Sequence, residues 1–266
     1  MKNIDDLKIF CTDVDGTILK KGEKTFSNNI NEAFKNIFET NNLLIVASGR
    51  TYRNLRSLFF NDDRVVYLCE NGNLLRYKNK TLFVSSFDDE VYSLLDELKS
   101  YQDLFIEICT PDKTYTYSSY EEINKFFKTN YLDFTSLDGS VRSIKEKIIK
   151  VSYFFPTKNM EEFSKLHQHF LDKYKDKIEI FDSNNLWIDF SPKGINKGTT
   201  LKFFMDKYSL PFSSLYCFGD GENDIDMLKI SKNSYCESSG LDNVKNISNN
   251  IFSDFKKTVD EIIFSK

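Results

Sequence analysis

The sequence KIFCT at positions 8–12, followed by DVDGT at 13–17, is the strongest indication of the fold. The first five residues form a short apolar run of β-forming residues, which is typical of a buried strand in a parallel sheet. Side chains alternate along a strand, so Asp13 and Asp15 point to the same side where this strand ends. Gly16 lets the chain turn away without a Cβ clash. The stretch therefore predicts a buried strand that ends in a pair of carboxylates.

Strands and helices are expected to alternate around this stretch. Residues 43–47 (LLIVA) form a second apolar run, and residues 28–40 place apolar side chains at helical spacing. Strand, helix and strand in this order indicate a right-handed βαβ unit. Further strands are expected at 65–69 and 214–218, and further helices at 197–208 and 222–231. The sequence therefore predicts an α/β fold with a parallel sheet.

The middle of the chain has a different pattern. Helical stretches followed by paired strand patterns occur twice, which indicates an inserted α+β domain with an antiparallel sheet. The helices are expected near 89–99, 120–129 and 159–174, and the strands near 104–109, 113–118, 147–155, 178–182 and 186–190. We place the inserted domain at 84–188 and the α/β core at 1–83 and 189–266.

Composition and charge exclude several classes of protein. The 266 residues are 40% apolar, which supplies a real core and excludes a disordered chain. The 40 acidic and 36 basic residues give a net charge of −4, which argues against nucleic acid as a partner. No apolar run is long enough to span a bilayer, and Asp5 and Asp6 lie near the start, so we expect a soluble, cytoplasmic protein without a membrane partner. The sequence gives no indication of an oligomeric state.

Histidine and cysteine are too few and too scattered for most sites built on them. His167 and His169 are two apart on an expected helix and point to different faces, which disfavours a Ser-His-Asp triad or a histidine-rich metal site. The five cysteines include no C-x-x-C pair, which fits a reducing compartment and argues against a disulfide framework or a zinc ribbon. None has an arginine six residues later, so the Cys-x5-Arg loop of thiol phosphatases is absent.

The carboxylate pair of the first strand lies where open parallel sheets bind ligands, in the crevice outside the carboxyl ends of the strands. Two close carboxylates repel each other unless a cation neutralises them. Mg²⁺ prefers oxygen ligands and commonly takes one or two carboxylates together with a phosphate. An Asp-rich surface turn is the alternative, which the preceding apolar strand disfavours. Asp13 and Asp15 therefore predict a magnesium site.

Two other expected strand ends carry polar groups of matching chemistry. Ser48 and Gly49 offer a hydroxyl and a backbone N–H to a phosphate oxygen where the second strand ends. The late strand ends in GDGEND, in which Asp220 suits a hard cation, and Asn223 and Asp224 suit its surroundings or a phosphate. A helix cap is the alternative for this acidic run, because Asn and Asp are common at helix N-termini.

Lys197 opens the expected helix at 197–208. A positive charge at a helix start is unfavourable with the helix dipole, which indicates that the ammonium points at an anion. A solvated surface lysine is the alternative, because the chain has 36 basic residues.

Together, the motifs DVDGT at 13–17, SGR at 48–50, Lys197 and GD-x-x-ND at 219–224 resemble the haloacid dehalogenase (HAD) superfamily. Their order, with a long insertion between the second and third, is similar to that of Cof-type phosphatases with a C2 cap. The run ENG at 70–72 resembles the same subfamily. The resemblance implies a Rossmann-like parallel-sheet core with an inserted α+β cap domain. One stretch departs from the pattern: YCESSG at 235–240 stands where the family often has M-G-N-A.

The resemblance also implies a role for each motif residue. Asp13 would be the nucleophile that takes the phosphoryl group, and Asp15 the acid that protonates the leaving oxygen and the base that activates water. Asp13, Asp220 and the Asp15 carbonyl would hold Mg²⁺. The phosphoryl oxygens would contact Ser48, Lys197, Asn223 and the N–H groups of Val14 and Gly49. Asp224 would support the metal ligands without binding the ion itself. The substrate would contact Arg50 and Asn71.

The expected function is a Mg²⁺-dependent phosphatase that acts on a small phosphorylated metabolite, in the first place a sugar phosphate. The cap is expected to cover the site and exclude water. Its loops near 110–113 and 182–185 are candidates for setting substrate choice. Three alternatives stay open: a sugar phosphomutase, a flavin or pyridoxal phosphate phosphatase, and a non-catalytic phosphate-binding module.

Overall fold

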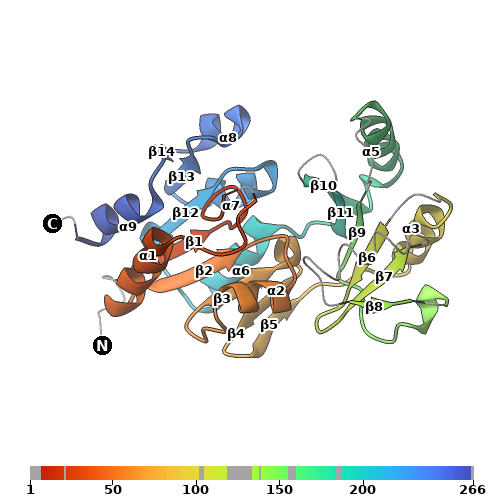
Figure 1. Ribbon diagram of the computed structural model, residues 1–266, viewed down its shortest axis with the longest axis horizontal. Coiled ribbons are helices and arrows are strands. Elements are labelled where there is room, and N and C mark those ends of the chain that lie inside the picture. The colour runs from red at the N-terminus through yellow and green to blue at the C-terminus, as the bar shows by residue number, and fades with distance from the viewer. Residues whose placement is uncertain are drawn as a thin grey trace. The chain divides into compact units, whose positions relative to one another are not determined.

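The computed structural model describes residues 7–20, 22–101, 105–118, 134–137, 139–154, 160–183 and 187–264. The chain forms two compact units, each with its own sheet (Figure 1). The core unit comprises Met1–Arg50, Leu55–Phe83 and Asn196–Lys266, and the inserted unit comprises Thr51–Asn54 and Val84–Ile195. Residues 189–195, which we expected in the core, group with the inserted unit because strand β11 (Trp187–Pro192) lies inside the second sheet.

The core unit is built on an eight-stranded sheet within the described residues, in the order β14-β13-β12-β1-β2-β3-β4-β5. The strands from β14 to β3 are parallel, and β4 runs antiparallel to β3. Their bounds are Ile9–Thr12 (β1), Leu43–Ala47 (β2), Val66–Cys69 (β3), Leu74–Tyr77 (β4), Lys80–Val84 (β5), Leu215–Gly219 (β12), Asn233–Glu237 (β13) and Asn250–Phe252 (β14). This parallel sheet confirms the α/β fold class predicted from the sequence.

Helices cover both faces of the core sheet. On one face the aliphatic side chains of β1 and β2, such as Ile9 and Ile45, pack with helices α6 and α7 through Leu201 and Met227. The other face is aromatic, because Phe218 packs edge-on against Phe255 of α9. The helix bounds are Asn28–Glu39 (α1), Tyr52–Leu58 (α2), Lys197–Lys207 (α6), Ile225–Lys229 (α7), Asp242–Ile247 (α8) and Phe255–Phe264 (α9). Side-chain alternation along each strand separates the two kinds of packing.

Among its described residues, the inserted unit has a six-stranded sheet in the order β10-β11-β9-β6-β7-β8. Its neighbours are antiparallel except for the β7–β8 pair. The bounds are Phe105–Cys109 (β6), Thr114–Ser118 (β7), Thr135–Ser136 (β8), Lys150–Phe154 (β9), Ile178–Ser183 (β10) and, for the helices, Glu90–Leu98 (α3) and Met160–Tyr174 (α5). The expected helix at 120–129 lies outside the described residues.

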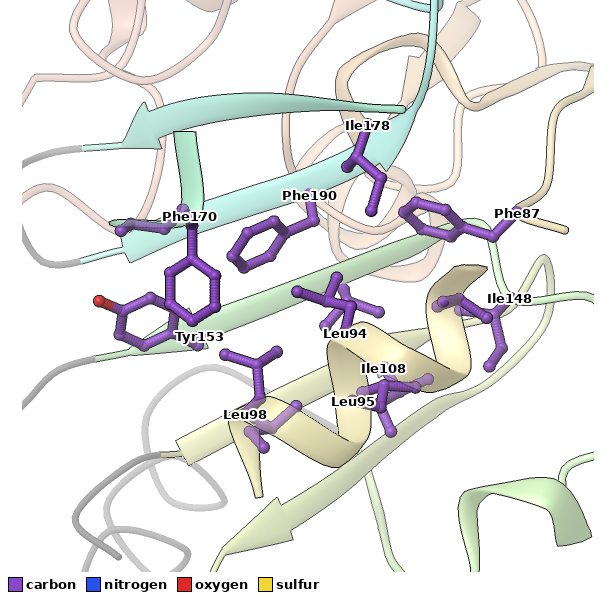
Figure 2. Close-up of a cluster of buried hydrophobic side chains, with 14 of the residues drawn as sticks. Phe87, Leu94, Leu95, Leu98, Ile108, Ile148, Tyr153, Phe170, Ile178 and Phe190 are labelled. Atoms are coloured by element: carbon purple, nitrogen blue, oxygen red, sulfur yellow. The ribbon is translucent and has the colours of Figure 1, made fainter. Parts of the chain in front are cut away.

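The two faces of the inserted sheet differ in chemistry. One face packs against α3 and α5, where Leu94, Ile108, Tyr153 and Phe170 belong to a single apolar cluster (Figure 2). Alternate residues therefore face the other way, and they include a row in register across four strands. This polar row consists of Thr116, Glu107, Ser152 and Asp189, all buried.

The remaining features bear on the expected environment of the protein. All five cysteines are buried thiols. Among the described residues, none of the helices combines the length and the apolar character needed to cross a membrane.

Candidate active site

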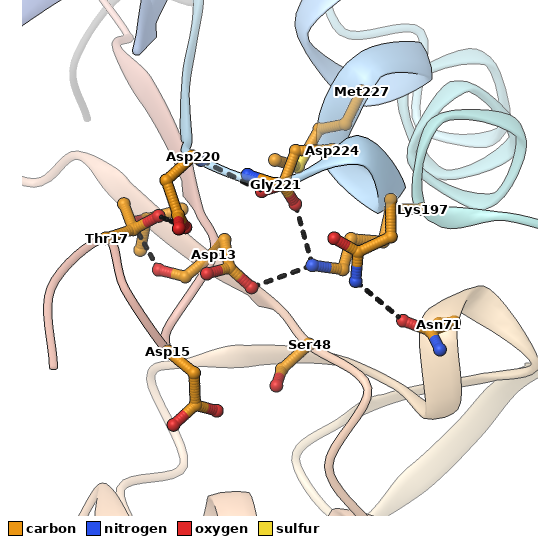
Figure 3. Close-up of polar contacts among 12 residues, drawn as sticks. Asp13, Asp15, Thr17, Ser48, Asn71, Lys197, Asp220, Gly221, Asp224 and Met227 are labelled. Atoms are coloured by element: carbon orange, nitrogen blue, oxygen red, sulfur yellow. Dashed lines mark hydrogen bonds and ion pairs between the residues drawn. The ribbon is translucent and has the colours of Figure 1, made fainter. Parts of the chain in front are cut away.

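The predicted site residues gather where β1, β2 and β12 end and where α6 begins (Figure 3). These strands are adjacent in the sheet, in the order β12-β1-β2, and they run parallel. Their carboxyl ends therefore meet at one edge, as the βαβ pattern predicts. The loops that follow these strands carry Asp13, Ser48 and Asp220.

The loop after β1 is closed on itself by backbone hydrogen bonds. The N–H groups of Ile18 and Leu19 donate to the Val14 carbonyl at 3.1 and 2.8 Å, and the Gly16 N–H donates to the Leu19 carbonyl at 2.9 Å. The Asp13 N–H continues the strand ladder to the Phe218 carbonyl of β12 at 2.9 Å. This ladder and turn fix the backbone that carries the Asp13 carboxylate. The residue is buried, with only 5% of its surface exposed.

Gly16 is required by both its backbone angle and its surroundings. Its φ of +92° lies in the left-handed region that favours glycine. A Cβ atom at this position would lie 2.3 Å from Asp220 Oδ2, closer than any van der Waals contact. The glycine thus lets the β1 loop approach the β12 loop, where the Thr17 hydroxyl donates to Asp220 Oδ1 at 2.6 Å.

Lys197 is fully buried, and its ammonium lies between two carboxylates. Its Nζ donates to Asp13 Oδ1 and to Asp224 Oδ1, each at 2.7 Å. The ammonium at this helix start therefore points at anions, as we inferred from its position. Asn196 caps the helix by accepting from the Thr199 N–H at 2.9 Å, so the cap leaves the Lys197 side chain to the site.

Asp224 is fully engaged by groups of the protein. Its Oδ1 accepts from Lys197, and its Oδ2 accepts from the N–H groups of Asp220 and Gly221, both at 3.0 Å. A Cβ on Gly219 would lie 2.6 Å from the Cβ of Asp224, so that glycine permits this packing. Asp224 thus holds both the backbone of the β12 loop and the Lys197 side chain in place.

The site carries more negative than positive charge. One ammonium contacts Asp13 and Asp224, and single carboxylate oxygens of Asp13, Asp220 and Asp224 lie within 4.8 Å of one another. Burial raises the pKa of Asp13 well above its usual range; Lys197 opposes this shift, whereas the charges of Asp224 and Asp220 increase it. Burial likewise raises the pKa of Asp220 to about 6. Burial alone would lower the pKa of Lys197, but Asp13 and Asp224 outweigh it and raise that pKa.

This charge imbalance fits a divalent cation. A cation would compensate the two carboxylate charges that one lysine leaves over and would favour their ionised forms. Asp13 and Asp220 suit this role best, because both oxygens of Asp224 already accept hydrogen bonds from the protein. Hard oxygen ligands of this kind select Mg²⁺ or a similar ion.

The loop after β2 places Ser48 and Gly49 beside the third strand. Ser48 is 2% exposed, its N–H donates to the Leu68 carbonyl at 3.0 Å, and its carbonyl accepts from the Asn71 N–H at 3.1 Å. A Cβ on Gly49 would lie 3.2 Å from Asn71 Oδ1, so this backbone lies close to the Asn71 amide. The Ser48 hydroxyl accepts from the Arg50 N–H at 3.2 Å.

Arg50 and Asp15 form an ion pair with two parallel hydrogen bonds. Arg50 Nε donates to Asp15 Oδ2 at 2.7 Å, and Nη2 donates to Asp15 Oδ1 at 2.6 Å. The Asp15 carboxylate therefore turns toward Arg50 and does not join the cluster of three acids. We expected Arg50 to contact substrate, and its pairing with Asp15 is a contact that sequence reasoning missed.

The turn after β3 brings Asn71 to Asn223. Asn223 Nδ2 donates to Asn71 Oδ1 at 3.1 Å, which links the β3 and β12 loops. Glu70 and Asn71 both have left-handed φ values, of 53° and 54°. At Gly72 a Cβ would lie 2.4 Å from the Asn196 carbonyl oxygen, so the turn packs closely against the start of α6.

The unusual stretch at 235–240 supports the site from the side of β13. The Leu241 N–H donates to the Asp220 carbonyl at 3.0 Å, and a Cβ on Gly240 would lie 3.1 Å from the Asp220 Cα. Glu237 accepts hydrogen bonds from the side chains of Ser238 and Ser239. The departure from M-G-N-A thus leaves a loop that packs directly on Asp220.

Thr17 is a further residue of the site, and the sequence patterns assign no role to it. Its hydroxyl fixes one oxygen of Asp220, and the signal for it was present in the DVDGT motif, where a hydroxyl residue follows the glycine. The partner could not be inferred, because 203 residues separate the two side chains.

The chain is similar in sequence to known proteins over most of its length. The sequence model of the haloacid dehalogenase-like hydrolases matches residues 10–259. The 5-amino-6-(5-phospho-D-ribitylamino)uracil phosphatase YitU of Bacillus subtilis is 23% identical over 249 residues, which cover 91% of this chain and 90% of that protein.

Solved structures are similar over nearly the whole chain. The protein SMU.1108c of Streptococcus mutans has a TM-score of 0.84 and 26% identity, with 97% of this chain and 100% of that chain covered. The HAD subclass IIB sugar phosphatase BT4131 has a TM-score of 0.80 and 16% identity, with 96% and 98% covered. The second likeness shows a common fold.

Proposed function

The chain belongs to the haloacid dehalogenase-like hydrolases, as a phosphatase of the Cof type, and from this we propose that it hydrolyses a small sugar or polyol phosphate with Mg²⁺ through an aspartyl-phosphate on Asp13. The observation that carries the proposal is the buried contact of Lys197 Nζ with Asp13 Oδ1 at 2.7 Å, beside two further carboxylates. Such a site places a nucleophilic carboxylate beside a positive charge that can compensate the negative charge of a phosphate.

Asp13 has the surroundings that a carboxylate nucleophile requires. Its backbone is held by the β1–β12 ladder, and Lys197 fixes the direction of its side chain. Covalent catalysis divides one displacement at phosphorus into two, and carboxylates serve this purpose in phosphoryl transfer. Orientation and charge stabilisation account for most of what a protein supplies to such a reaction.

We assign Mg²⁺ to Asp13, Asp220 and the Asp15 carbonyl. The ion would neutralise charge on the phosphoryl oxygens and orient the phosphate. Thr17 supports this assignment, because its hydroxyl restrains the Asp220 carboxylate at 2.6 Å. Asp224 supports it indirectly by holding Lys197 and the N–H groups of the β12 loop.

The phosphoryl oxygens would be held by donors from three loops and from the first turn of α6. These donors are the Ser48 hydroxyl, the Asn223 amide, the Lys197 ammonium and the backbone N–H groups of Val14 and Gly49. Donors fixed by the fold stabilise developing charge without reorganising during the reaction. Asn71 supports this arrangement through its hydrogen bond with Asn223.

The organic part of the substrate is proposed to be polyhydroxylated. The names of the two enzymes that resemble this chain specify a sugar phosphatase and a phosphatase of a phosphoribityl compound.

The decisive experiment is a phosphate-release screen with and without Mg²⁺. The panel comprises hexose phosphates, pentose phosphates, ribitol phosphate, flavin mononucleotide and pyridoxal phosphate. We expect Mg²⁺-dependent release that is fastest with a sugar or polyol phosphate. Fastest release from flavin mononucleotide or pyridoxal phosphate would contradict the substrate class but not the reaction.

The Asp13→Asn variant tests the mechanism. It should abolish hydrolysis of p-nitrophenyl phosphate while its circular dichroism spectrum and thermal unfolding remain those of a folded protein. Retention of most activity would contradict the nucleophile assignment. Isomerisation that requires a bisphosphate, without net phosphate release, would instead identify a phosphomutase, and an inactive wild type across the panel would indicate a phosphate-binding module.

A further inference from the structure

The ion pair between Arg50 and Asp15 joins the loops that follow β1 and β2. The guanidinium uses Nε and Nη2 to meet both carboxylate oxygens, at 2.7 and 2.6 Å. This paired geometry fixes both the position of the carboxylate and the orientation of its plane. A single ammonium contact would fix the distance alone.

Both partners are attached to backbone that the fold holds in place. The Arg50 N–H donates to the Ser48 hydroxyl at 3.2 Å, and its carbonyl accepts from the Glu70 N–H at 3.1 Å. Asp15 lies in the closed β1 loop and forms a bridge with Leu19. The orientation of the ion pair therefore follows from the backbone of two sheet loops.

The Asp15 carboxylate needs such a restraint because it is not packed. Its side chain is 44% exposed and that of Arg50 is 25% exposed. An exposed carboxylate on a fixed backbone still samples several rotamers. By comparison, the Asp13 side chain is 7% exposed and is already held by Lys197.

We propose that Arg50 is a positioning residue that holds the Asp15 carboxyl group for proton transfer. The inference rests on the phosphatase function proposed above and replaces the expected role of Arg50 as a substrate contact. In the first half-reaction Asp15 starts as a protonated carboxyl group. The Asp13–phosphorus bond forms, the bond to the leaving oxygen breaks, and that oxygen takes the Asp15 proton, which leaves Asp15 as the carboxylate that pairs with Arg50. In the second, water attacks phosphorus, the Asp13–phosphorus bond breaks, and the water proton returns to Asp15.

This role predicts a dependence on the leaving group. An alkyl alcohol is strongly basic when it leaves and needs a positioned acid, whereas dinitrophenolate leaves without one. Loss of Arg50 should therefore slow phosphorylation of Asp13 by an alkyl phosphate on the order of tenfold to hundredfold, which is part of the roughly hundredfold to ten-thousandfold that general acid catalysis contributes. Phosphorylation by 2,4-dinitrophenyl phosphate should change less than threefold.

The experiment measures single-turnover phosphorylation by rapid quench with Mg²⁺, using glycerol 3-phosphate and 2,4-dinitrophenyl phosphate. Arg50→Ala should show the selective loss, and Arg50→Lys should recover part of it, because an ammonium restores one contact. Arg64→Ala is the matched control: Arg64 also binds both carboxylate oxygens of an aspartate, Asp62, but at the surface. Arg64→Ala should leave both rate constants unchanged.

A double-mutant cycle and a spectroscopic measurement complete the test. Asp15→Asn should lose the same selective step, and the double variant with Arg50→Ala should lose little more, because both changes remove one function. In ¹⁵N NMR spectra, the Arg50 Nε–H signal of the wild type should show slowed solvent exchange that Asp15→Asn abolishes. This signal reports the ion pair without any turnover.

Several results would overturn the proposal. Equal losses with both esters would assign Arg50 to the phosphoryl group, and a raised KM with unchanged kcat would assign it to substrate binding. An active wild type whose Arg50→Ala variant behaves like Arg64→Ala would refute this inference alone. A wild type that transfers no phosphate from either ester would refute the proposed function, and the inference with it, even where the NMR signal of the ion pair persists.

Discussion

Lys197 Nζ donates a 2.7 Å hydrogen bond to Asp13 Oδ1, although 184 residues separate the two side chains. The same ammonium contacts Asp224, so one buried cation holds the carboxylates of two different loops. A buried ammonium with two carboxylate partners is a strong restraint, because removal of either kind of partner leaves unpaired charge in a poorly solvated place. The energetic and catalytic roles of this contact can be separated by mutation.

Replacing Lys197 with Met should destabilise the metal-free protein by about 3 to 5 kcal/mol, because Asp13 and Asp224 lose their shared counter-charge. Urea unfolding in the presence of EDTA measures this free energy. Adding Asp224→Asn to the variant should restore part of the loss, since one uncompensated carboxylate disappears. Equal stability of wild type and Lys197→Met would show that the ammonium is not the main counter-charge.

Gly16→Ala should abolish phosphatase activity through a steric effect at Asp220. The matched control is Gly22→Ala, because Gly22 also has a positive φ, of 88°, but a Cβ there meets no atom within 4 Å. Gly22→Ala should lose about 1 kcal/mol of stability and keep its activity. Measurements of kcat and urea unfolding on both variants distinguish backbone strain from the clash, and similar activity in the two variants would contradict the steric argument.

Mg²⁺ should stabilise the protein by binding to the folded state. At a concentration one hundred times its Kd, the gain in unfolding free energy should be about 2.7 kcal/mol, and EDTA should remove it. Asp220→Asn should abolish this gain. Asp242→Asn, whose side chain is 96% exposed in the wild type, should retain it. A Mg²⁺-dependent shift that survives in Asp220→Asn would place the ion elsewhere.

Glu97 should make the inserted unit sensitive to acid. It accepts hydrogen bonds from Lys173 and Tyr174 at 2.8 and 2.6 Å and pairs with His169 at 2.7 Å, which joins α3 to α5. Burial would raise the pKa of Glu97, but these hydrogen bonds outweigh it and lower that pKa below its usual value of 4.5. A carboxyl group with a lowered folded-state pKa stabilises the protein above its unfolded-state pKa, and this contribution is lost as the pH falls through the folded value.

The Glu97→Gln variant tests this dependence. It should be about 1 kcal/mol less stable than the wild type at pH 7, and the difference should shrink as the pH falls below 4.5. Amide hydrogen exchange in α5 between pH 3 and 7 provides the measurement, with Glu161→Gln as a control because that side chain is 77% exposed. A difference in stability that does not vary with pH would refute the role of the charge.

Most elements of the fold could be predicted, because their signals are local. Apolar runs and helical spacing predicted β1, β2, α1 and α5 to within about two residues. Residues 189–195, which we expected in the core, group with the inserted unit instead. The alternation in WIDFSP predicts a strand, but its place inside the second sheet also depends on pairing with β9, from which α5 and β10 separate it in the sequence.

The residues of the candidate site could also be predicted from local signals, but the contacts between their side chains could not. Parallel strands bring their carboxyl ends to one edge, so Asp13, Ser48 and Asp220 were expected together, and the structure places them there. The side-chain partners could not be read from the strand pattern. The Thr17 hydroxyl donates to Asp220. Arg50 pairs with Asp15, whereas we expected it to contact the substrate.

The positions of the acidic and hydroxyl residues at the strand ends could be predicted from the sequence, because apolar periodicity indicates where a strand ends and glycine indicates where the chain turns. The same local signals predict an acidic, phosphate-type site on an α/β core with an inserted domain. The balance of charges in the site follows from the folded chain, since burial and distance depend on packing between segments far apart in the sequence. One buried lysine serves two carboxylates there, a third carboxylate bonds to Thr17, and Asp15 pairs with Arg50.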